Sequence, residues 1–170
     1  MMVPPVYPWK RFWYPREGQA SLADGGFLLD PDSEYAKYYT TDVVPFDSIR
    51  DTQCLVFLGE PGIGKSTALK TEFESVGRAI FGSGDRALWF DLRDFSSDER
   101  LERKILECEQ IQAWLGTQGM LHLFLDSFDE GLLEIHNISR VLLSVLESLP
   151  SERLRLRVAS RPLDWQATLG

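Results

Sequence analysis

A glycine-rich loop ending in Lys-Ser is the strongest chemical signal in this sequence. Residues 59–66 read Gly-Glu-Pro-Gly-Ile-Gly-Lys-Ser and match the phosphate-loop pattern G-x-x-x-x-G-K-[ST] at every fixed position. Glycines let the main chain curl, so that successive N–H groups point into one hollow at a helix N-terminus and hold phosphates. Lys65 would contact the β- and γ-phosphates, and the Ser66 hydroxyl would contact Mg²⁺. The expected nucleotide-binding residues are Gly59, Glu60, Pro61, Gly62, Ile63, Gly64, Lys65, Ser66 and Thr67.

A group of acidic residues follows an apolar run further along the chain. Residues 121–125 are Leu-His-Leu-Phe-Leu, and Asp126 comes directly after them. In a parallel sheet this strand end lies near the phosphate loop, so Asp126 is expected to hold Mg²⁺, mainly through water. Asp129 and Glu130 come next, and one of them could orient or deprotonate the water that attacks the γ-phosphate. The alternative is that this pair caps the next helix or faces solvent.

Arg161 directly follows the last expected strand, 154–160. We expect its strand to lie next to the strand that ends at Asp126. A guanidinium placed there can reach the γ-phosphate and sense whether it is present. The alternative is an ordinary ion pair with a surface carboxylate. The predicted catalytic residues are therefore Asp129, Glu130 and Arg161, and the predicted metal ligands are Ser66 and Asp126.

The elements that must position these residues alternate between strand and helix patterns. Apolar runs predict strands at 54–58, 87–90 and 121–125, the first of them buried on both faces. The segment 154–160 is expected to be the fourth strand. Apolar residues spaced by three or four predict helices. The helices are expected at 65–76, from a cap at Ser97 and Asp98 to about Leu115, and at 138–149. The apolar face of the middle helix is Leu101, Ile105, Cys108, Ile111 and Leu115. This order predicts parallel strands with right-handed crossovers.

Composition narrows the class of protein. The 170 residues are 44% apolar and 26% charged, enough for one domain with a core and not typical of disorder. A net charge of −8 does not support nucleic-acid binding. No apolar run approaches the roughly 20 residues of a membrane span, so no membrane contact is expected. The two cysteines, Cys54 and Cys108, have apolar neighbours and are expected to be buried thiols in a cytoplasmic protein.

Residues 1–45 have a different character. Near the start, prolines that favour extended chain alternate with aromatic side chains that are costly to leave in water. A turn at 24–26 and a short strand at 27–29 are also expected. The segment is either an arm packed across the domain's own core or a docking surface for a partner. We therefore divide the chain into an aromatic and proline-rich N-terminal arm, 1–45, and a core, 46–170.

Taken together, these motifs resemble the NACHT group of STAND nucleotide-binding switches, within the AAA-like ASCE class of P-loop NTPases. The resemblance covers the loop at 59–66, the segment 121–130, Ser160-Arg161-Pro162, and Leu-Arg-Asp-Phe at 92–95. It implies a three-layer α/β fold, with a mostly parallel sheet and helices on both faces. It also implies ATP (or ADP) and Mg²⁺ as cofactors, slow ATP hydrolysis and nucleotide-dependent self-association. Members of the group act as signalling switches in innate immunity and in bacterial defence against phage.

Two features depart from that group. Ser127 occupies a position that is usually glycine. The chain also ends at Gly170, shortly after the fourth core strand. We therefore expect an incomplete nucleotide-binding core that lacks the fifth strand and the C-terminal sensor region.

Two other classes of phosphate-loop protein are disfavoured by the sequence, and two alternatives remain. A GTPase would carry Asn-Lys-x-Asp, yet Asn137 is followed by Ile-Ser-Arg. An ABC-type ATPase would carry Leu-Ser-Gly-Gly-Gln, which is absent from the sequence. A small-molecule kinase stays open, as does a nucleotide-binding interaction module without turnover.

Overall fold

The computed structural model describes residues 10–18, 28–38, 42–134, 137–163 and 165. These residues belong to two compact units, an N-terminal unit (Met1–Thr52) and a C-terminal unit (Gln53–Gly170), and each is described by itself. No helix of the described residues has both the length and the apolar character needed to cross a membrane.

The N-terminal unit is built from short extended segments. Strand β1 (Phe12–Trp13) pairs antiparallel with β2 (Val44–Pro45). The ring of Trp13 meets that of Phe46 edge to face at 6.4 Å. Two 3-10 helices, η2 (Ala36–Tyr38) and η3 (Phe46–Ser48), complete the described part. The expected turn at 24–26 lies outside the described residues. Of the expected strand at 27–29, residue 28 forms an isolated β-bridge.

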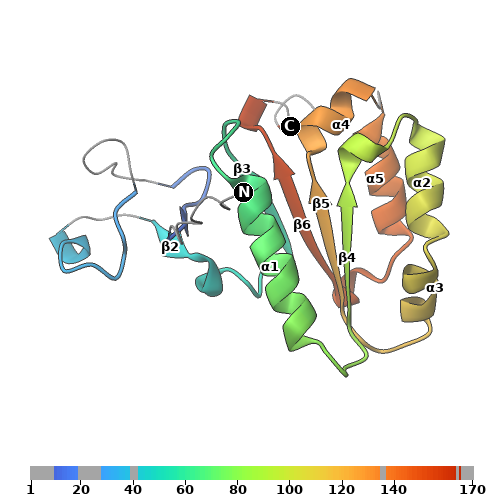
Figure 1. Ribbon diagram of the computed structural model, residues 1–170, viewed down its shortest axis with the longest axis horizontal. Coiled ribbons are helices and arrows are strands. Elements are labelled where there is room, and N and C mark those ends of the chain that lie inside the picture. The colour runs from blue at the N-terminus through green and yellow to red at the C-terminus, as the bar shows by residue number, and fades with distance from the viewer. Residues whose placement is uncertain (1–9, 19–27, 39–41, 135–136, 164, 166–170) are drawn as a thin grey trace, which may run out of the picture. The chain divides into compact units, whose positions relative to one another are not determined.

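The C-terminal unit is an α/β structure with a four-stranded parallel sheet (Figure 1). Its strands are β3 (Cys54–Leu58), β4 (Arg86–Asp91), β5 (Leu121–Asp126) and β6 (Leu154–Ser160). Their order across the sheet is β3-β6-β5-β4. The strand predictions are thus confirmed to within a residue, and β6 lies beside β5 as expected.

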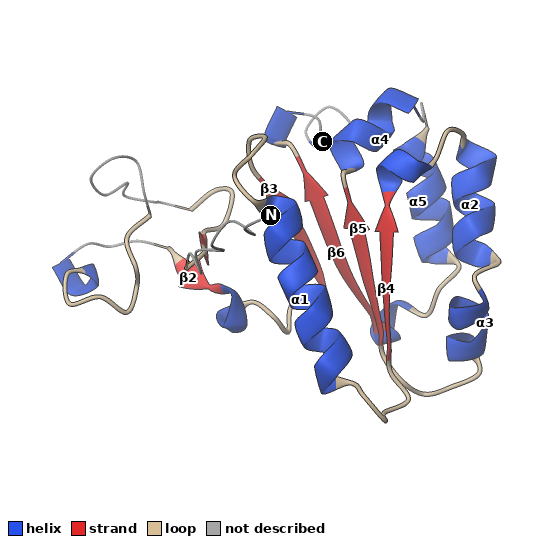
Figure 2. Ribbon diagram, viewed as in Figure 1, coloured by secondary structure: helices blue, strands red, loops and turns tan. Residues whose placement is uncertain are grey.

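Helices cover both faces of this sheet, as Figure 2 shows. Helix α1 (Lys65–Ala79) lies on one face, and the other carries α2 (Asp98–Leu106), α3 (Glu109–Leu115) and α5 (Ile138–Glu147). The short helix α4 (Phe128–Glu134) follows β5 at its carboxyl end. The alternation of strand and helix patterns therefore predicts the layers correctly.

Successive side chains of β5 point to opposite faces of the sheet. Leu121, Leu123 and Leu125 belong to the buried core that α2, α3 and α5 complete. Phe124 points to the α1 face, where its ring lies 5.4 Å from that of Phe73. Asp126, two residues further on, shares that face. The carboxylate is thereby directed to the side of the sheet where the phosphate loop enters α1.

The strand β3 is less buried than its apolar sequence predicts. Cys54 is exposed, and within β3 only Phe57 is classed as buried. The expectation of a doubly buried strand with a buried Cys54 thiol is therefore wrong. The reason is position, because among the described strands β3 is at an edge and pairs with β6 alone.

One expected helix is in fact two. The segment from Ser97 to Leu115 breaks after α2, and Cys108 adopts an extended conformation (φ −62°, ψ 116°) as the N-cap of α3. The break changes the direction of the chain, so Trp114 becomes fully buried while Leu115 is 38% exposed. The Trp114 indole N–H donates to the Gly119 carbonyl at 2.7 Å, which satisfies its polar group in the core. The predicted cap is confirmed, since the Ser97 hydroxyl accepts from the Arg100 N–H.

A close approach at Gly131 joins α4 to the 3-10 helix η4 (Leu92–Asp94). A β-carbon built on Gly131 would lie 2.9 Å from Ile138 Cδ1 and 3.0 Å from Leu92 Cβ, and both neighbours are fully buried. We therefore expect Gly131→Ala to lower the free energy of unfolding by about 1–3 kcal/mol in urea titrations.

The control for this substitution is Gly77→Ala on α1, where nothing lies within 4 Å of the added methyl group. That change should stabilise the protein by about 0.5–1 kcal/mol. Equal effects of the two substitutions would contradict the close approach.

Candidate functional site

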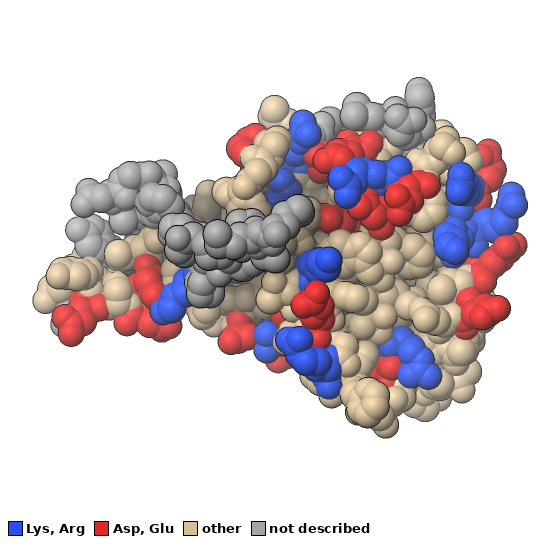
Figure 3. Space-filling model, viewed as in Figure 1, with Lys and Arg blue, Asp and Glu red and all other residues tan. Residues whose placement is uncertain are grey.

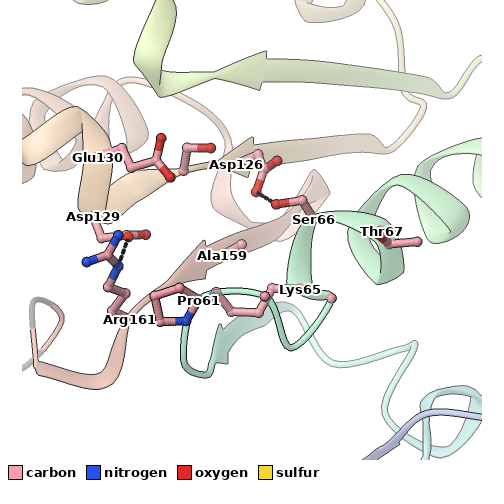
Figure 4. A pocket seen from close by; sticks show the side chains of 12 residues that line it. Pro61, Lys65, Ser66, Thr67, Asp126, Asp129, Glu130, Ala159 and Arg161 are labelled. Atoms are coloured by element: carbon pink, nitrogen blue, oxygen red, sulfur yellow. Dashed lines mark hydrogen bonds and ion pairs between the residues drawn. The ribbon is translucent and has the colours of Figure 1, made fainter.

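A pocket of about 310 Å³ opens at the carboxyl ends of the strands (Figure 4). The phosphate loop contributes Pro61, Gly62, Gly64, Lys65, Ser66 and Thr67 to its wall. The strand ends and α4 contribute Asp126, Asp129, Glu130 and Arg161. Of the predicted site residues, Gly59, Glu60 and Ile63 belong to the loop but do not line the pocket. The pocket thus brings together residues that are up to a hundred positions apart in the sequence.

The curl of the loop depends on its glycines. Gly62 has a φ of +80° and Gly64 a φ of +95°, values in the left-handed region that favours glycine. Gly64 is also the N-cap of α1, so the loop delivers the chain directly into the helix. The first N–H groups of α1 therefore lie at the pocket, where the helix dipole favours an anion.

Lys65 folds back over its own loop. Its ammonium donates to the carbonyl oxygens of Gly59 and Glu60, at 2.5 and 3.2 Å. Both partners are uncharged main-chain groups. A phosphate oxygen would be a stronger acceptor for this ammonium than either carbonyl, because its negative charge adds a Coulombic attraction to the hydrogen bond.

Ser66 and Asp126 join the loop to the tip of β5. The Ser66 hydroxyl donates to Asp126 Oδ1 at 3.0 Å, and Figure 4 shows the two side chains pointing toward each other. Asp126 is buried, and this burial raises the pKa of its carboxyl group, although the hydrogen bond from Ser66 opposes the rise. A buried carboxylate of this kind is stabilised by a nearby cation.

This pair of oxygens fits Mg²⁺ as part of a larger coordination sphere. Within the part of the chain that the structure describes, no group of three or more His, Cys, Asp or Glu side chains could hold a metal ion. Mg²⁺ commonly takes one or two protein ligands and completes its octahedron with water and substrate phosphates. Ser66 and Asp126 are the residues that would hold it here.

The two acids of α4 have different surroundings. Both lie in the first turn of the helix, and both line the pocket. Asp129 is almost fully buried and pairs with Arg161, with 2.7 Å between Oδ2 and Nε. The Glu130 side chain is 43% exposed, and its Oε2 is 3.6 Å from Arg93 Nε. Glu130 is therefore held much more loosely than Asp129.

The site contains two residues that sequence reasoning missed. Ser127 and Ala159 both line the pocket. Ser127 has a φ of +59°, a left-handed conformation that is uncommon for a residue other than glycine. A glycine would adopt this conformation without strain. Ser127 could have been found from its place directly after Asp126, where the resemblance leads one to expect glycine. Nothing in the local sequence distinguishes Ala159.

A second acidic strand end stands next to Asp126. Asp91 is the register partner of Asp126 across the β4–β5 pair. The Arg93 guanidinium donates to both carboxylate oxygens of Asp91, and this contact lowers the pKa of Asp91. The Ser127 hydroxyl also hydrogen-bonds to Asp91 and lowers that pKa further. The two adjacent carboxyl groups are therefore shifted in opposite directions.

Charges of both signs surround the pocket. Its wall carries two cations, Lys65 and Arg161, and three carboxylates, Asp126, Asp129 and Glu130. Figure 3 shows acidic and basic side chains intermixed at this end of the sheet. Since the wall itself has an excess of one negative charge, a polyphosphate would bind best together with a divalent cation.

Comparisons with models of protein families, with curated proteins and with solved structures found no match. The case for a function therefore depends on the residues of the pocket and their geometry.

Proposed function

We propose that this protein is an ATP- and Mg²⁺-binding signalling switch of the NACHT type that hydrolyses ATP slowly. The observation that carries the proposal is the hydrogen bond from Ser66 to Asp126. It places the end of the phosphate-loop motif and the acid at the tip of β5 in one pocket. Because a buried carboxylate is costly unless a cation or hydrogen bonds stabilise it, the position of Asp126 beside the loop supports a cation site.

Binding of the triphosphate would use the loop and the start of α1. The main-chain N–H groups of the loop and the N-terminal end of the helix would hold the α- and β-phosphates. Lys65 would exchange its two carbonyl acceptors for β- and γ-phosphate oxygens. Ser66 and Asp126 would hold Mg²⁺, which would supply positive charge to offset the charge that develops on the phosphate oxygens.

Hydrolysis would use the acids and the arginine around the γ-phosphate. Glu130 is the better-placed residue to orient the attacking water, because its carboxylate is partly exposed and only loosely paired. Arg161 would stabilise the charge on the transferred phosphoryl group. Asp129, closely paired with Arg161, is less free to accept a proton.

The wider role follows from the resemblance of the motifs. We propose that the chain acts in the cytoplasm, self-associates in response to nucleotide, and works with a C-terminal sensor region in defence against phage or other infection. The strand order β3-β6-β5-β4 supports the γ-phosphate role of Arg161, because Arg161 directly follows β6, the strand next to the one that ends at Asp126.

Two assays with purified protein test the proposed function. Titration calorimetry with Mg–ATP should detect binding, and a phosphate-release assay without any acceptor should detect slow turnover. The absence of ATP binding would refute the proposal. Release that requires an added small molecule would indicate a kinase, and binding without release would indicate an interaction module.

The substitution Glu130→Gln is expected to slow phosphate release by about 10²–10⁴-fold, because it removes the group that acts on water. The affinity for Mg–ATP should change little, since a water-orienting residue acts mainly in the transition state. Single-turnover phosphate release and calorimetry measure the two quantities separately. A rate equal to that of the unmodified protein would show that the base lies elsewhere.

A further inference from the structure

We propose that Asp129 weakens triphosphate binding by competing with the γ-phosphate for Arg161, and so sets the preference between ATP and ADP. The inference rests on the proposed function, and it assigns to Asp129 a role in specificity rather than in proton transfer. Its basis is the ion pair between Asp129 Oδ2 and Arg161 Nε, with 2.7 Å between them.

The two partners of this ion pair differ in their freedom to move. The Asp129 side chain is 8% exposed and is fixed on the first turn of α4. The Arg161 side chain is 44% exposed and follows the end of β6. A ligand that enters the pocket can therefore draw Arg161 away while Asp129 stays in place. Figure 4 shows the pair at the edge of the pocket, on the side away from Ser66.

A terminal phosphate competes well for this arginine. It carries more charge than a carboxylate, and a guanidinium can bind it through two parallel hydrogen bonds. The carboxylate of Asp129 opposes the exchange, because it retains Arg161 in the ion pair.

The effect is confined to the third phosphate. The main-chain N–H groups of the loop would hold the α- and β-phosphates, and these interactions are shared by ATP and ADP. Lys65 would also reach the γ-phosphate, but Asp129 pairs with Arg161 rather than with Lys65 and leaves that contact unchanged. Only the γ-phosphate extends toward the acids and Arg161. Removing the Asp129 charge should therefore tighten triphosphate binding and leave diphosphate binding nearly unchanged.

The experiment measures calorimetric affinities of the Asp129→Asn protein for Mg–ADP and for a Mg-bound ATP analogue with a non-hydrolysable β,γ bond. We expect the analogue to bind the Asp129→Asn protein about tenfold more tightly than it binds the unmodified protein. A change of about tenfold is typical of the coupling between two interacting groups. The affinity for Mg–ADP should stay within about twofold. Asp129→Ser, which keeps a hydroxyl acceptor at the helix start, replaces the asparagine variant if that protein does not fold.

Two controls separate competition for Arg161 from a general change in charge. Asp94→Asn removes one charge from an exposed carboxylate that does not line the pocket, and it should leave both affinities unchanged. In a protein that already carries Arg161→Gln, the further change Asp129→Asn should increase analogue affinity much less than tenfold.

Three results would contradict competition between Asp129 and the γ-phosphate. An unchanged ratio of analogue to ADP affinity, an equal gain for both nucleotides, or a full gain in the Arg161→Gln background would overturn the proposal while leaving nucleotide binding established. If the unmodified protein binds neither nucleotide, the proposed function fails and this inference fails with it.

Discussion

Replacing Lys65 with alanine is expected to lower the affinity for Mg–ATP by about a hundredfold or more. Loss of one partner from a hydrogen-bonded charge pair at a binding site costs about 2–5 kcal/mol, and Lys65 would make such contacts to the phosphates. Fold stability should change little, because the only hydrogen bonds of its ammonium within the described residues go to two carbonyl groups of its own loop. Titration calorimetry and urea unfolding measure these two effects.

Lys70→Ala provides the control for this experiment. Lys70 is exposed on the same helix, α1, and is absent from the wall of the pocket. It carries the same charge, so a long-range electrostatic effect on nucleotide binding would act on both variants. We expect Lys70→Ala to bind ATP almost as the unmodified protein does. If Lys65→Ala also retains its affinity, the assignment of the phosphate loop is wrong.

Replacing Asp126 with asparagine is expected to have two opposite effects. The Mg²⁺ dependence of ATP binding should be lost, with a fall in affinity of about tenfold or more at saturating Mg²⁺. In the absence of nucleotide, however, the variant should be more stable than the unmodified protein at neutral pH. The amide can still accept the hydrogen bond from Ser66, and it removes a buried charge.

The sign of the stability change follows from the pKa of Asp126. Burial raises this pKa above its ordinary value, so the folded state binds the proton more tightly than the unfolded state. The stabilising contribution of Asp126 is therefore full below the unfolded pKa and is lost as the pH rises through the folded pKa. At neutral pH the charged carboxylate is a net cost to the fold, which the asparagine variant avoids.

Asp91→Asn is the matched control, since Asp91 is the register partner of Asp126 and is shifted the other way. Arg93 lowers its pKa, so its contribution is present above the unfolded pKa and is lost as the pH falls through the folded one. Asp91→Asn should therefore lower stability at neutral pH. Urea unfolding at pH 4 and pH 7 compares the two variants. A loss of stability in both would contradict the burial argument for Asp126.

Many residues of the candidate pocket can be predicted from local sequence. Glycine at positions 62 and 64 is needed wherever the chain adopts a positive φ, and this need acts within a few residues. Apolar runs and helical spacing reflect burial on one or two faces, so they predict the strands closely and α1 and α5 approximately. Asp126 could be placed at a strand end because its strand is short and clearly bounded.

Contacts between distant residues lie beyond such patterns. The break between α2 and α3, the exposure of Cys54 and the burial of Trp114 depend on which strands are neighbours and where helices pack. The ion pair between Asp129 and Arg161 joins segments separated by a whole helix and strand. The opposite pKa shifts of Asp91 and Asp126 arise from burial and from Arg93, neither of which the spacing of residues reveals. Local sequence thus predicts which groups the pocket holds, whereas packing decides how each is charged and paired, because burial and electrostatic contact depend on distance in space rather than along the chain.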